Sequence, residues 1–135
     1  MIKIQSDSLV IHASAETLFQ KVSNFSNFGN LMPDKVQNWQ ATENSCSFEI
    51  TGMASLAMHI EEKTMPTCVR IVSDAPSPFP FELIFNFTPQ GEDTTSSLVS
   101  MQVEVNAMLQ MMVKKPLQNF VNILNTQLKQ ACETK

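Results

Sequence analysis

The sequence predicts an α+β fold in which a curved antiparallel sheet of about six to seven strands wraps around one long C-terminal helix. Apolar and polar residues alternate from about Ser45 to Val105, and an apolar stripe with helical spacing runs from Leu109 to Leu128. Period two is typical of strands with one buried face, and spacings of three and four are typical of a helix with one buried face. The 135 residues are enough for one domain, residues 1–135.

The N-terminal region is expected to contain one strand and then two short helices. Residues 1–12 alternate like a strand, but the phase of the alternation changes midway, which predicts a bulge or bend. Ser14 is a good N-cap for the helix that follows. A second helical or turn segment, residues 25–33, is loosened by Gly29 and ended by Pro33.

The strands that follow are expected to form a meander with one apolar face. Glu43-Asn44, Gly52-Met53 and residues 90–93 have the composition of turns, and residues 74–80 form a stiff proline-rich connection. We expect strands at 35–42, 45–51, 55–62, 67–74, 81–88 and 96–105. The alternation places the acids and His59 on the outer, solvent-facing side of the sheet.

The last element is predicted to be a helix from about Ala107 to Cys132. Pro116 lies inside it, where proline removes a backbone donor and crowds the preceding turn. We therefore expect a kink there, or two abutting helices with Pro116 in the first turn of the second. The stripe facing the sheet should contain Leu109, Met112, Val113, Leu117, Phe120, Leu124 and Leu128.

Composition argues against several classes of function. The net charge is -4, and Lys114-Lys115 is the only basic pair, so no nucleic-acid partner is expected. The three cysteines have no metal-binding spacing, and we interpret them as free thiols. The sequence has no signal-peptide pattern and no apolar run of about 18 residues, so we expect a cytoplasmic protein without stable membrane insertion.

Several stretches resemble small uncharacterised bacterial members of the START/Bet v 1-like (SRPBCC) superfamily. They are FSNFGNLMP at 25–33 with DKVQNWQAT after it, SFEITGMA at 47–54, SPFPF at 77–81 and MMVKKPLQNFVNIL at 111–124. The resemblance covers nearly the whole chain and implies a helix-grip fold with a cavity between the sheet and the C-terminal helix. This superfamily includes lipid carriers, hormone receptors, polyketide cyclases and chaperone activators, so the fold alone does not specify function.

The expected function is the binding or transport of a small hydrophobic or amphipathic ligand in that cavity. One alternative is an enzyme of the polyketide cyclase or aromatase type, and another is a protein-interaction module with a filled core, like the chaperone activators. We predict no catalytic residue, no metal and no cofactor, and the oligomeric state stays open. The expected lining is Phe48, Leu56, Met58, Ile71, Leu83, Phe85, Met101, Met112 and Phe120.

Five further features each have two interpretations. Arg70 is a possible polar anchor inside the cavity, or else forms an outer-face ion pair with Glu61 or Glu82. Trp39 packs on the sheet or borders a cavity mouth. Lys114-Lys115 is a solvated helix face or recognises an anionic head group. His59 is expected at the surface rather than in a metal or catalytic site. The methionines, which fill a core or form a deformable ligand wall, are Met58, Met101, Met108, Met111 and Met112.

Overall fold

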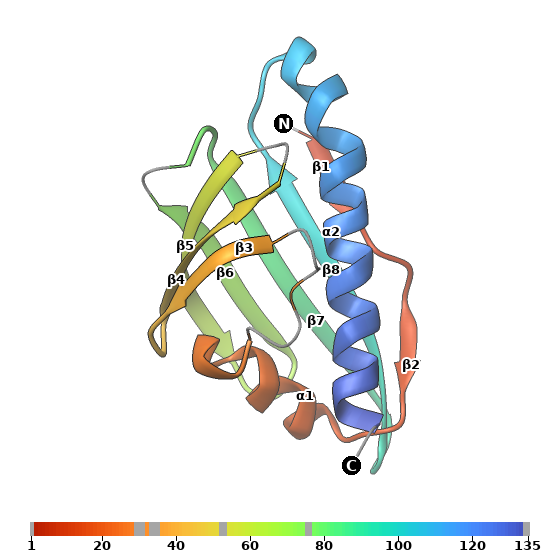
Figure 1. The fold of residues 1–135 in the computed structure, drawn as a ribbon. Coiled ribbons are helices and arrows are strands. Elements are labelled where there is room, and N and C mark those ends of the chain that lie inside the picture. The colour runs from red at the N-terminus through yellow and green to blue at the C-terminus, as the bar shows by residue number, and fades with distance from the viewer. Residues whose placement is uncertain (1, 29–31, 33–35, 52–53, 75–76, 134–135) are drawn as a thin grey trace.

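The structure is a computed structural model that describes residues 2–28, 32, 36–51, 54–74 and 77–133. It contains one curved sheet, a long C-terminal helix and a short helical segment between the second and third strands (Figure 1). The elements are β1 (Ile2–Gln5), β2 (Leu9–Ile11), α1 (Ala15–Val22), the 3₁₀ helix η1 (Phe25–Asn27), β3 (Val36–Ala41), β4 (Ser45–Ile50), β5 (Ala54–Thr64), β6 (Cys68–Asp74), β7 (Phe81–Gly91), β8 (Thr94–Val103) and α2 (Ala107–Glu133).

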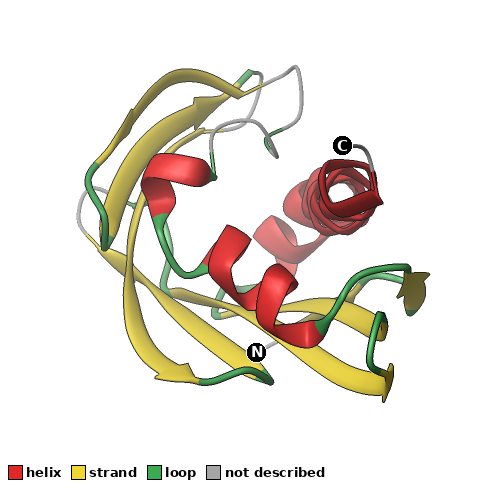
Figure 2. Ribbon diagram, turned by 90° about the horizontal axis from the view of Figure 1, so that it is seen from below, coloured by secondary structure: helices red, strands yellow, loops and turns green. Residues whose placement is uncertain are grey.

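The eight strands form one antiparallel sheet, which confirms the predicted fold class. Their order is β1-β8-β7-β6-β5-β4-β3, and β2 also pairs with β8. The sheet curves toward α2, which is seen end-on in Figure 2, and α1 lies across one end of the curved sheet, the lower end in Figure 1. The single strand expected at residues 1–12 is divided into β1 and β2, and the division falls where the alternation changes phase.

Local capping explains where the two short helices begin. The Thr17 backbone N–H donates to Ser14 Oγ at 3.2 Å, as the N-cap assignment required. In η1, Asn24 Oδ1 accepts a hydrogen bond from the Ser26 N–H at 2.8 Å. The expected roles of Gly29 and Pro33, like the expected Gly52-Met53 turn, lie outside the described residues.

Helix α2 runs without interruption from Ala107 to Glu133, so it is one helix with Pro116 inside it and not two abutting helices. Its sheet-facing residues from Val113 to Leu128 are buried as predicted. The first turns differ from the prediction: Leu109 is 37% exposed and Met112 is 66% exposed. The reason is that the N-terminal end of α2 extends past the ends of the strands, so the sheet does not cover it (Figure 1).

The core lies between the inner face of the sheet and α2. Cross-strand pairs such as Phe48 with Leu56, and Ile71 with Leu83, bury both partners on that face. A register shift near Ile60 interrupts the alternation in β5, and Ile60 is only partly buried. Apart from this interruption, period-two alternation places the apolar residues of the strands on the inner face of the sheet, as predicted.

A buried asparagine attaches α2 to the break between β1 and β2. The Asn125 side chain is 1% exposed, and its Oδ1 accepts a hydrogen bond from Ser97 Oγ at 2.7 Å. Its Nδ2 donates to the backbone carbonyls of Asp7 at 2.9 Å and Ser97 at 3.0 Å. Ser6 Oγ, which is within 3.2 Å of the same Nδ2, accepts the Val99 N–H at 3.0 Å. These bonds fix the position of α2 relative to β8 and the β1–β2 break.

Candidate functional site

Aromatic side chains form a continuous wall on the concave side of the sheet. Phe48 on β4 stacks on Phe120 of α2, with ring centroids 6.0 Å apart and planes at 16°. Trp39 lies 5.8 Å from Phe48 and is stacked on Phe28 at 6.1 Å. Phe28 then meets Phe85 edge to face at 5.7 Å. These separations are typical of attractive aromatic pairs, so the wall is a packed apolar surface of flat rings.

Trp39 reaches this wall because the backbone of β3 is irregular. Val36 and Trp39 are three residues apart, so simple alternation would place them on opposite faces. The β3–β4 register shifts between Gln37 and Gln40, and Asn38 has a φ of 56°. That left-handed conformation is tolerated by asparagine better than by most residues. The bulge turns Trp39 inward, in agreement with the expectation that it packs on the sheet.

Helix α2 lies close to only part of the sheet. Its backbone packs against β1, β2 and β8, and against α1. The aromatic stack of Phe120 on Phe48 connects it to β4, on the far side of the curved sheet. The concave region between α2 and the strands β4 to β7 is consequently filled or lined by side chains rather than by closely packed backbone.

Eight of the nine expected lining residues are buried on the concave side. They come from strands β4 to β8 and from α2, and none is more than 4% exposed: Phe48, Leu56, Met58, Ile71, Leu83, Phe85, Met101 and Phe120. The ninth, Met112, points away from the sheet. The clustering expected for the methionines is also wrong in part, because Met58 and Met101 are core residues whereas Met108, Met111 and Met112 are exposed.

Arg70 forms an ion pair with Glu82 on the outer face of the sheet. Its neighbours Val69 and Ile71 are fully buried, so the alternation of β6 points the guanidinium away from the concave side. The hydrogen bond to Glu82 is the main cause of the raised pKa of Arg70. The outer-face ion pair is therefore the correct alternative, and the Arg70 side chain does not point toward the concave side of the sheet.

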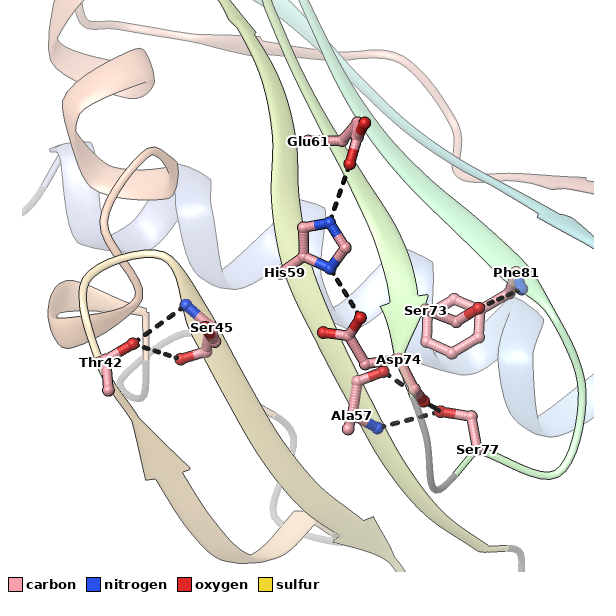
Figure 3. Close-up of polar contacts among 9 residues, drawn as sticks. All are labelled: Thr42, Ser45, Ala57, His59, Glu61, Ser73, Asp74, Ser77 and Phe81. Atoms are coloured by element: carbon pink, nitrogen blue, oxygen red, sulfur yellow. Dashed lines mark hydrogen bonds and ion pairs between the residues drawn. The ribbon is translucent and has the colours of Figure 1, made fainter.

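His59 is also on the outer face, where it bridges two strands. Its Nε2 lies 2.8 Å from Glu61 Oε2 and its Nδ1 lies 2.8 Å from Asp74 Oδ1 (Figure 3). A neutral imidazole has only one N–H, so the arrangement with both carboxylates ionised requires the imidazolium. The hydrogen bond to Glu61, followed by that to Asp74, raises the pKa of His59.

Ser77 is hydrogen-bonded to two neighbouring strands close to His59. Its Oγ donates to the Asp74 carbonyl at 2.6 Å and accepts the Ala57 N–H at 3.1 Å (Figure 3). A hollow of about 430 Å³ on the outer face is lined by Ala57, Asp74 and residues of the β3–β4 hairpin. It follows a row of paired residues across β3 to β6, namely Gln40, Ser47, Ala57 and Asp74. The small side chains of Ser47 and Ala57 explain the depression in that row.

The cysteines and the other titratable groups of the described residues give no sign of a metal site. All three cysteines are free, and burial is the main cause that raises the pKa of Cys46 to about 12, which keeps it a thiol. Among the residues that the structure describes, no group of three or more His, Cys, Asp or Glu side chains could hold a metal ion. Within the same residues, no helix is long and apolar enough to cross a membrane.

Two elements of the site were not recognised in the sequence. The inward bulge at Asn38 gives no periodic signal, although asparagine beside tryptophan in a strand of irregular alternation is a weak indication. The buried role of Asn125 was also missed. It lies among apolar residues that share its helix face, and a lone asparagine there is a signal for a buried hydrogen-bond network.

No protein-family profile and no curated protein matches the chain by sequence. Solved structures match it over nearly its whole length. A START superfamily protein from Mycobacterium smegmatis is 20% identical, with a TM-score of 0.77, and the match covers 97% of this chain and 97% of that chain. The protein XoxI from Bacillus cereus is 13% identical, with a TM-score of 0.77 and coverage of 98% and 96%.

A synthase has a similar architecture. Norcoclaurine synthase from Thalictrum flavum, solved as a point mutant with a transition-state analogue, is 10% identical to this chain. The TM-score is 0.75, and the match covers 97% of this chain and 93% of that chain. At such identities the likeness concerns architecture and not chemistry. Together with the curved antiparallel sheet and the long C-terminal helix, these matches show that the chain has the START/Bet v 1-like helix-grip fold.

Proposed function

We propose that the protein binds a small apolar or amphipathic molecule between α2 and the concave face of the sheet. The observation that carries the proposal is the chemistry of that face. In the described part of the chain, the buried side chains are apolar except for four serine and threonine residues and Asn125, and none is charged. A binding site for a small molecule is typically apolar with a few polar groups that orient the ligand.

The proposed lining is the set of eight buried residues on β4 to β8 and α2. The parallel rings of Phe48 and Phe120 favour a ligand with a flat apolar part, which could slide between or beside them. Met58 and Met101 on the neighbouring strands add flexible, polarisable walls that adapt to different shapes. Met112 and Arg70 are not part of this proposed site.

The buried polar groups favour binding over acid–base catalysis. Ser6, Ser97 and Asn125 hydrogen-bond to one another and to the backbone, and Thr95 Oγ1 donates to the Ala13 carbonyl at 2.8 Å. These hydrogen bonds stabilise the fold. General acid–base catalysis needs a titratable group beside the substrate, and the described His59, Arg70 and Glu82 lie on the opposite face of the sheet.

The test begins with protein purified from its own host and analysed by native mass spectrometry for a bound molecule. A titration with fatty acids, sterols and aromatic polyketides then follows the emission of Trp39, the only tryptophan, whose ring lies 5.8 Å from Phe48. We expect at least one class to change the emission saturably. If native mass spectrometry gives the mass of the protein alone and no class of ligand changes the emission of Trp39, the proposal is contradicted. That result would favour an interaction module with a filled core.

A variant pair locates the site. Met58→Trp adds bulk to the concave face and should abolish binding, whereas Met65→Trp adds the same side chain to an exposed position and should not. Circular dichroism and thermal melting establish that each variant is folded, and binding is measured by calorimetry because both variants add a second fluorophore. Unchanged affinity in folded Met58→Trp would place the ligand elsewhere.

A further inference from the structure

The most exposed apolar side chains of the described structure lie together at the free end of α2. Met108 is 74% exposed, Met111 is 85% exposed and Met112 is 66% exposed. Spacings of three and four place them on one face of the helix, opposite the buried Val113 and Leu117. Methionines usually fill cores, so three of them exposed side by side indicate a surface that makes contact with something apolar.

Two exposed lysines follow directly behind this methionine tip. Lys115 continues the same face one turn after Met111 and Met112, and Lys114 lies beside it. At 1.5 Å per residue, the lysine positions lie about 6 Å farther along the helix axis than the methionines. The side chains therefore change from apolar to cationic with distance from the tip.

We propose that the tip of α2 docks reversibly on an anionic lipid surface. The order of its side chains matches the depth profile of a membrane interface, where acyl chains lie beneath a layer of phosphate groups. The methionines would enter the acyl boundary while the ammonium groups of Lys114 and Lys115 stay at phosphate level. Charge complementarity selects an anionic surface over a neutral one.

The shape of the tip supports a lipid surface over two other partners. It extends past the ends of the strands, so it can enter a deformable layer without a matching groove (Figure 1). A symmetric pair of copies joined through the methionines with the two helix ends parallel would bring the Lys115 side chains of both chains close together, which costs electrostatic energy. An acidic amphipathic helix of another protein would need its own complementary groove for the three methionines.

The net charge of -4 limits the strength of this docking. Repulsion between the rest of the protein and an anionic surface should make the contact transient and sensitive to salt. The inference is independent of the proposed ligand site, because it concerns side chains that point away from the concave face.

Vesicle flotation tests the proposal with the purified full chain. We expect the protein to float with equimolar phosphatidylglycerol and phosphatidylcholine at low salt, and much less with phosphatidylcholine alone. Lys114→Gln with Lys115→Gln should lower the bound fraction at least about fivefold. Met108→Ser with Met111→Ser should remove binding even though both lysines remain.

Matched controls change the same residue types elsewhere on the surface. Met65 and Lys63 are both exposed and lie at the β5–β6 end of the sheet. The Met65→Ser and Lys63→Gln variants should therefore bind vesicles like the original protein. Absence of binding to anionic vesicles, or equal binding by the tip variants and the controls, would overturn the proposal. Light scattering that shows a dimer dissociated by Met108→Ser with Met111→Ser would also overturn it, by assigning the tip to a second copy.

Discussion

Helix α2 is connected in different ways to the two edges of the curved sheet. The near side is the edge with β1, β2 and β8, and the far side is the edge around β4. On the near side, hydrogen bonds join the helix to the β1–β2 region: Gln118 Nε2 donates to the Gln5 carbonyl at 2.6 Å, and Lys129 Nζ donates to the Val10 carbonyl at 2.9 Å. Asn125 adds its buried bonds to the same region. On the far side, the stacked rings of Phe48 and Phe120 connect β4 to the helix.

This difference means that the near side fixes the position of the helix, whereas the far side tolerates small displacements. Hydrogen bonds depend steeply on distance and angle, so the near side determines where the helix lies. Contacts between rings are less directional and tolerate small displacements. The far side can therefore adjust to a ligand while the helix stays attached to the near side, which is how a proposed container could open without losing its fold.

Removing the ring that bridges to the far side should have the largest effect. Phe120→Ala is expected to lower the free energy of unfolding by about 3–5 kcal/mol, because it deletes a buried aromatic side chain from the core. Chemical denaturation measures the loss. Ile123→Ala, a partly exposed position on the same helix, is the control and should change little. A loss below about 1 kcal/mol for Phe120→Ala would show that the two sides are not coupled through this ring.

Breaking the attachment on the near side should cost less. Asn125→Ala leaves the buried Ser97 Oγ, the buried Ser97 carbonyl and the part-buried Asp7 carbonyl without this partner, and we expect a loss of about 1–3 kcal/mol. Exposed Asn119→Ala on the same helix should be nearly neutral. Equal denaturation midpoints for the two variants would contradict the assignment of Asn125 as the principal polar attachment.

The bulge in β3 offers a test confined to the far side. Asn38→Val should destabilise by about 1–2 kcal/mol, because a β-branched residue resists the left-handed backbone, whereas Asn38→Gly should be tolerated. If the bulge is lost, Trp39 turns outward and its emission should shift to the red. Identical emission and stability of the valine and glycine variants would mean that the bulge does not direct Trp39.

The smallest expected effect is the pH-dependent stabilisation of the fold by His59 on the outer face of the sheet. The pKa of His59 is raised in the folded protein, so its stabilisation is complete below the unfolded value of about 6.5 and disappears as pH rises through the folded pKa. We expect less than about 1 kcal/mol, because the imidazole and both carboxylates are partly exposed to solvent.

Thermal melts of the original protein and of His59→Gln measure this contribution. Both are recorded at pH 6 and at pH 8.5, and the difference between them should be larger at pH 6. Glu49→Gln, an exposed acid on the same face, serves as the control for the loss of a surface charge interaction. A difference that is constant or larger at pH 8.5 would contradict the proposed imidazolium bridge.

The sequence is sufficient to predict the fold because each element has its own local signal. The alternation in β4, β7 and β8, the N-cap at Ser14 and the stripe from Val113 to Leu128 all predict structure without knowledge of the partner. The exposed tip of α2 could not be predicted in this way. The apolar period continues through Leu109 and Met112, but only the length of the sheet determines where coverage of the helix ends.

Residues whose direction depends on strand register were ambiguous for a similar reason. Arg70 lies in a strand where both parities contain apolar residues, so its direction depends on the pairing of β6 with β5 and β7. The inward turn of Trp39 depends on one backbone angle at Asn38. Both depend on tertiary pairing, which local periodicity does not contain.

The bulge at Asn38 has a consequence for the protein at high concentration. Strand β3 forms one edge of the sheet, and a regular edge presents backbone donors and acceptors that another chain can pair with. The left-handed residue and the register shift interrupt that row in the middle of a six-residue strand. The same irregularity that turns a tryptophan into the interior therefore opposes edge-to-edge polymerisation, so a substitution that straightens β3 would both misplace the ring and expose a template for aggregation.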